Sequence, residues 1–78
     1  MSHKTVTQAY LIALSDERAL LRDMMARGDD LAIEAPAMLA SAKAQQGRGY
    51  AGDMAEYIRG SIDFWRNQCA KLASPATI

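Results

Sequence analysis

Apolar residues recur along the first third of the chain at the spacing of a helix with one buried face. Thr5 and Gln8 match a capping box, in which a hydroxyl and a side-chain amide satisfy each other's backbone donors. Gly28 follows Arg27, and a glycine after a terminal cation is typical of a helix end. We therefore predict one helix over 5–27. Its apolar positions are Val6, Tyr10, Ala13, Leu14, Leu20, Leu21, Met24 and Met25.

The middle of the chain contains a proline within an otherwise helical pattern. Inside a helix, Pro36 would remove one backbone hydrogen bond and clash with the carbonyl of Ala32. We therefore expect a turn or short irregular helix over 31–35, followed by a regular helix over 36–46 that begins at the proline. The segment 47–52 reads GRGYAG and is predicted to be a loop.

A second strong apolar stripe predicts a helix over 53–73. Asp53 is the expected N-cap, because a carboxylate can accept from the first free amides. Trp65 is expected to be buried. Gly60 lies mid-helix, where glycine costs about 1 kcal/mol relative to alanine, and close approach of another helix backbone is the preferred explanation. The stripe consists of Met54, Ile58, Ile62, Trp65, Cys69 and Leu72.

Since no segment shows a strand pattern, the predicted fold class is all-α: a small helical hairpin or three-helix unit, with its two long helices antiparallel. We expect one domain over 1–78, with mobile ends at 1–4 and 74–78. Half of the residues are hydrophobic, but alanine makes up a large share of them and contributes little burial. A chain this small sits near the limit of independent stability, so we predict a homodimer.

Composition disfavours several classes of function. Nine basic and nine acidic residues are interspersed and give no net charge, whereas a nucleic-acid binder needs a basic face. The single cysteine and the absence of a signal-peptide pattern favour a reducing cytoplasm. The longest apolar run, 9–14, is far shorter than the roughly 20 residues that span a membrane. We expect neither nucleic-acid nor membrane binding.

No group of residues indicates catalysis or metal binding. His3 lacks a neighbouring ligand, and Cys69 lacks a nearby histidine base. The carboxylates sit at helix starts or on predicted polar faces, where nothing would tune them for acid–base chemistry. The sequence therefore predicts a non-enzymatic protein without a metal or another cofactor.

The aromatic residues near the C-terminal helix suggest a function. Tyr50, Tyr57 and Phe64 repeat every seven residues, so on a continued helix they share one side. They can belong to a core or an oligomer seam, or remain exposed as a recognition patch with Arg59, since Tyr, Trp and Arg dominate binding hot spots. We predict a protein–protein interaction module: an adaptor, a chaperone-like factor or a small inhibitor of a larger protein. Small inhibitors of bacterial viruses share this economy, by association only.

The loop at 47–52 offers an alternative function. GRGYAG formally matches GxGxxG, a glycine pattern that lets a backbone approach a pyrophosphate. Arg48, Gly49 and Tyr50 would then hold a nucleotide or another small anion between subunits. The strand that precedes such a loop in dinucleotide-binding units is missing here, so a flexible helix connection is the simpler interpretation.

Overall fold

The computed structural model describes residues 6–73, which form three α-helices with no strand among them. Helix α1 spans Gln8–Arg27, α2 spans Leu31–Gln46 and α3 spans Gly52–Ala73. The prediction of an all-α fold with three helices is confirmed for this part of the chain. The predicted mobile ends, 1–4 and 74–78, lie outside the described residues.

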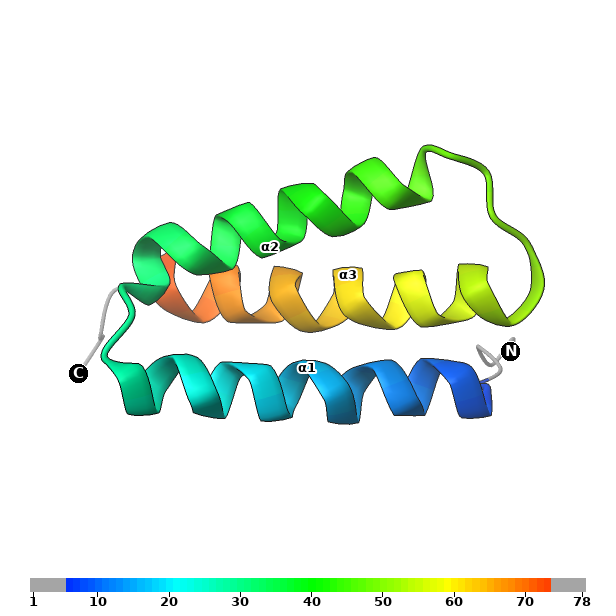
Figure 1. The fold of residues 1–78 in the computed structure, drawn as a ribbon. Coiled ribbons are helices and arrows are strands. Elements are labelled where there is room, and N and C mark those ends of the chain that lie inside the picture. The colour runs from blue at the N-terminus through cyan, green and yellow to red at the C-terminus, as the bar shows by residue number, and fades with distance from the viewer. Residues whose placement is uncertain (1–5, 74–78) are drawn as a thin grey trace, which may run out of the picture.

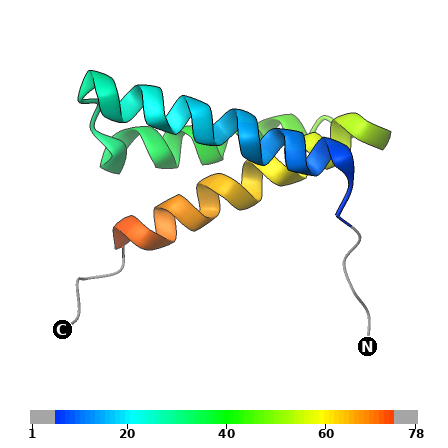
Figure 2. The same cartoon turned by 90° about the horizontal axis from the view of Figure 1, so that it is seen from below.

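Helix α3 lies between α1 and α2 and makes most of the contacts that join the helices (Figure 1). Helix α2 runs opposite to α1, and α3 runs in the same direction as α1. The predicted antiparallel arrangement of the two long helices was therefore wrong, because two short connections reverse the chain twice. Figure 2 shows that α3 is close to α1 near its N-terminal end and separates from it toward its C-terminal end.

The start of α1 differs from the prediction, and its end agrees with it. Thr7 is the N-cap, and its hydroxyl accepts a hydrogen bond from the amide of Tyr10. The predicted cap, Thr5, lies outside the described residues, and the helix begins at Gln8. At the other end Gly28 adopts φ 79° and its amide donates to the carbonyls of Met24 and Met25. Glycine is favoured there because a left-handed backbone costs it nothing.

Helix α2 continues through Pro36, so the expected irregular segment at 31–35 was wrong. Asp30 caps the helix, and its carboxylate accepts from the amide of Ala32. Because the proline lies in the second turn, its missing N–H costs one helical bond near an end that is already anchored by this cap. Ala35, directly before the proline, is fully buried and holds this turn against the core.

Helix α3 begins one residue before the expected position. Gly52 is its first residue and adopts φ 65°, so Asp53 lies in the first turn rather than at the cap. The carboxylate there still opposes the positive end of the helix dipole. The connection at 47–51 lacks regular secondary structure, as predicted for the GRGYAG segment.

The core collects around Trp65, which is fully buried as predicted. Met24 of α1 and Ala35 of α2 pack with it, so one end of the molecule joins all three helices. A second cluster joins only α2 and α3, through Ala42, Ile58 and Ile62. The predicted stripe on α3 is therefore buried at its centre. At its ends, Met54 and Leu72 are exposed.

Gly60 lies at the closest approach of α1 and α3. An ideal Cβ at this position would stand 2.8 Å from the Ala13 Cβ and 2.8 Å from the Tyr10 carbonyl oxygen. Real side chains do not approach backbone atoms so closely, so only glycine fits here. The expectation that another helix backbone approaches Gly60 is confirmed.

Candidate functional site

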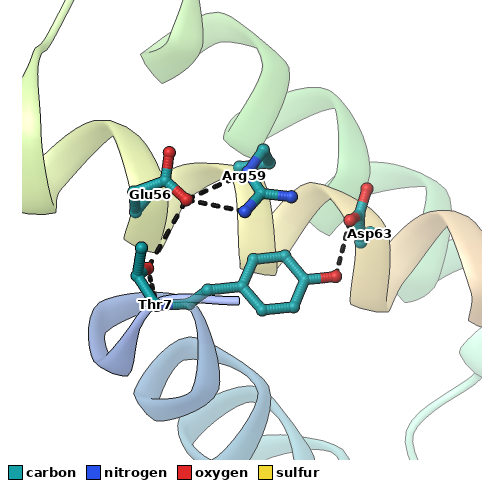
Figure 3. A network of polar contacts seen from close by, with 5 residues as sticks. Thr7, Glu56, Arg59 and Asp63 are labelled. Carbon is teal, nitrogen blue, oxygen red and sulfur yellow. Dashed lines mark hydrogen bonds and ion pairs between the residues drawn. The ribbon is translucent and has the colours of Figure 1, made fainter. Parts of the chain in front are cut away.

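A polar network joins the start of α1 to α3 (Figure 3). The Thr7 hydroxyl donates to Glu56 Oε1 at 3.4 Å. Arg59 donates to the same oxygen from Nε and Nη2, at 3.2 and 2.6 Å. These hydrogen bonds to Arg59 lower the pKa of Glu56 and raise the pKa of the guanidinium. Glu56 is therefore held as a carboxylate between two helices.

Tyr10 extends this network along α1. Its ring lies under the guanidinium of Arg59, 4.3 Å from Cζ to the ring centroid, a geometry in which the cation is attracted to the ring face. Its hydroxyl donates to Asp63 Oδ2 at 2.6 Å, and this hydrogen bond, followed by burial, raises the pKa of Tyr10. Asp63, expected to face water among the basic residues of α3, is instead half-buried and bonded to α1. Arg59, a predicted partner contact, is engaged within the chain.

Tyr57 makes a separate contact with α1. Its hydroxyl donates to Asp16 Oδ2 at 2.7 Å. This bond raises the pKa of Tyr57 from 10.0 to about 12, with burial as the second cause. The ring is half-buried beside Ile58 and Ser61, in a small hollow that Glu17 also lines. The structure therefore gives Tyr57 a part in joining α1 to α3, with a portion of its ring open to a partner.

Phe64 lies one helical turn past Gly60 and is half-buried. Its ring meets the Trp65 ring edge-on, with centroids 5.0 Å apart. One side of Phe64 lines an open groove of about 400 Å³ between α1 and α3. Among the predicted partner residues, Phe64 combines a fixed position with an accessible cavity. The groove lies where the two helices separate toward the C-terminal end of α3 (Figure 2).

The residues of the 47–52 loop lie apart from that groove. Arg48, Gly49 and Tyr50 are exposed, and Tyr50 precedes α3, so it does not continue the helical side of Tyr57 and Phe64. The amides at 47–49 donate to the carbonyls of Lys43, Gln45 and Gln46. These donors end α2 and are not directed at a ligand, which does not favour the anion-binding alternative.

Sequence analysis missed a second, larger groove. It measures about 540 Å³ and runs between α2 and α3, and Lys43 is its only charged wall residue within 6–73. The signal was present in the sequence: from Leu31 to Gln46 only Glu34 and Lys43 carry charge. Expecting a turn over 31–35 concealed this long apolar helix. The remaining wall residues are Ala32, Pro36, Leu39, Ala40, Cys69, Leu72 and Ala73.

Other expectations concern chemistry. Within residues 6–73 no three His, Cys, Asp or Glu side chains gather where a metal ion could bind. No helix of this part is long and apolar enough to cross a membrane. Cys69 is a free thiol in the wall of the α2–α3 groove. Comparison of the chain with protein-family models, with curated proteins and with solved structures gives no match.

Proposed function

We propose that this chain is a non-enzymatic protein-interaction module, an adaptor or small inhibitor, that acts through α3. The observation that supports it is that α3 borders two open grooves, of about 540 and 400 Å³. Both volumes lie within the range of natural binding sites. Each groove is walled by side chains of two helices, so its shape is set by the packing around Trp65 and Gly60.

The α2 side of the molecule is the proposed homodimer interface. Helix α2 packs against α3 on one face, yet its opposite face is also uncharged. A helix that is apolar on all sides is usually buried on all sides. Ile33 on α2 and Leu72 on α3 are 64% and 48% exposed, and a second copy would cover both. The exposed small residues of α2 are Ala32, Ala37, Ala40 and Ala44.

The α1–α3 side then stays open for a different protein. Phe64 and Tyr57 present partly accessible rings there, on a helix anchored to α1 by the Asp16 and Asp63 hydrogen bonds. Rigid aromatic side chains contribute strongly to binding because little conformational entropy is lost when they are covered. We place this interaction in the cytoplasm, where a single cysteine stays reduced.

Affinity capture from the native host tests this function. A tagged chain should retain one or more specific proteins, and the double variant Tyr57→Ala, Phe64→Ala should lose them while keeping its helical circular dichroism. Tyr50→Ala is the matched control, because Tyr50 is an exposed ring outside α3. If the folded double variant captures the same proteins at the same yield, α3 is not the binding helix.

A further inference from the structure

The groove between α1 and α3 has a charge pattern that the linear sequence conceals. Arg18 of α1 and Lys71 of α3 line it from opposite walls, and both are exposed. Within residues 6–73, neither side chain forms a hydrogen bond or an ion pair. Two cations thus face one cavity without an anion between them.

The single carboxylate of this groove is already engaged. Asp63 accepts the hydroxyl of Tyr10 at 2.6 Å, so it does not neutralise Arg18 or Lys71. Helical spacing places Arg22 one turn beyond Arg18 on the same side of α1. Asp16 and Glu17 point to the other side, where Asp16 binds Tyr57 and Glu17 lines a different hollow. Folding therefore separates charges that are interspersed in the sequence.

The rest of the groove wall is mixed. Leu14 and Phe64 provide an apolar surface, and Asn67 with Gln68 provides amide groups that can donate or accept. An apolar surface beside two unpaired cations matches a ligand that carries an apolar side chain next to carboxylates. A polynucleotide would use the cations and leave the apolar wall uncovered, and it would need a wider basic face than this neutral chain offers.

We infer that the α1–α3 groove binds an acidic segment of a partner protein, with an apolar side chain against Leu14 and Phe64 and carboxylates paired with Arg18 and Lys71. This inference rests on the proposed protein-binding function and specifies the chemistry of its partner. The surrounding positive charge also speeds encounter with an acidic surface, and this effect weakens as salt is added.

The experiment uses the chain with a capped helical peptide of Glu and Leu. Trp65 is the only tryptophan and touches Phe64 edge-on, so its emission reports a ligand in the groove. We expect the peptide to bind, to change Trp65 emission and to bind more weakly at high ionic strength. Peptides with Lys in place of Glu, or Ser in place of Leu, should bind much more weakly.

Matched variants locate the site. Arg18→Gln with Lys71→Gln should weaken binding of the Glu–Leu peptide by about tenfold, since an exposed ion pair contributes up to about 1 kcal/mol. Lys43→Gln, an exposed cation in the other groove, should leave binding unchanged. Four results would overturn the inference: no binding of the peptide, equal binding by the double variant, equal binding of the Lys peptide, or tighter binding of an oligothymidine to the same groove.

The outcome separates this inference from the proposed function. Suppose the double Gln variant still captures host proteins that the Tyr57 and Phe64 variant loses. The chain would then bind proteins through α3 without an acidic partner segment, and only the inference would be wrong. Equal capture by all variants would instead contradict the proposed function.

Discussion

Gly60 and Ala13 form the closest contact between α3 and α1. A Cβ built on Gly60 would stand 2.8 Å from the Ala13 Cβ, which is well inside van der Waals contact. The position of α3 against α1 thus depends on a missing methyl group. The Thr7–Glu56 and Tyr10–Asp63 hydrogen bonds lie on either side of this contact along α3, so the polar network needs the same close approach.

Gly60→Ala is therefore expected to destabilise the fold. Alanine gains about 1 kcal/mol in helix propensity, but inserting a methyl group into a closed contact costs about 1–3 kcal/mol. Since the Tyr10 carbonyl is backbone and cannot rotate away, we expect a net loss, measured by urea unfolding. Gly47→Ala is the control: its φ is −64° and a Cβ there meets nothing closer than 3.4 Å. A Gly60→Ala protein as stable as the parent would contradict this view of the contact.

Much of this contact could be predicted from sequence, because a glycine inside a strong helical pattern demands a reason. The burial of Trp65 and the turn at Gly28 followed in the same way from local patterns. Helix direction did not, since it depends on how many connections reverse the chain. Pro36 misled the analysis because a local rule was given more weight than the Asp30 cap and the buried Ala35.

The candidate site was only partly predictable. Phe64 was singled out correctly as an aromatic residue of α3, but its groove also requires Leu14 and Arg18 from a helix more than forty residues away in sequence. Arg59 looked like a free surface cation, whereas the structure stacks it on Tyr10 and pairs it with Glu56. Pairings between helices carry no signature in the spacing along one helix, so one sequence could not provide them.

Trp65 should dominate the stability of the core. Trp65→Ala removes the one large side chain that joins all three helices, and such truncations cost about 3–5 kcal/mol. Trp65→Phe should cost less, because it keeps a ring and also removes an indole N–H that is buried without a hydrogen-bond partner. Thermal and urea unfolding followed by circular dichroism will rank the two variants. The reverse order would show that the indole N–H is satisfied.

Stability should fall at alkaline pH through Tyr57. Its hydroxyl donates to Asp16, which raises the folded-state pKa to about 12 from an ordinary 10.0. A group that binds its proton more tightly when folded stabilises fully below its unfolded pKa, and that contribution is lost as pH rises from 10 to about 12. Tyr57→Phe should flatten this decline in urea unfolding measured across the range.

Tyr10→Phe should act in the same direction, since Asp63 likewise raises the pKa of Tyr10. Tyr50→Phe is the control, because the hydroxyl of Tyr50 makes no hydrogen bond in the part of the chain that the structure describes. An alkaline limb identical in all three variants would mean that these two tyrosines do not carry the pH dependence.

The proposed homodimer predicts that a charge on the outer face of α2 produces monomers. Ala40 is exposed and borders the α2–α3 groove, so Ala40→Glu would bury an unpaired carboxylate if a second copy covers this face. Light scattering should give twice the 8.5 kDa chain mass for the parent and the chain mass for Ala40→Glu. Ala26→Glu places the same charge on an exposed position of α1 and should stay dimeric. A parent chain of 8.5 kDa at micromolar concentration would leave α2 without a second copy to cover it.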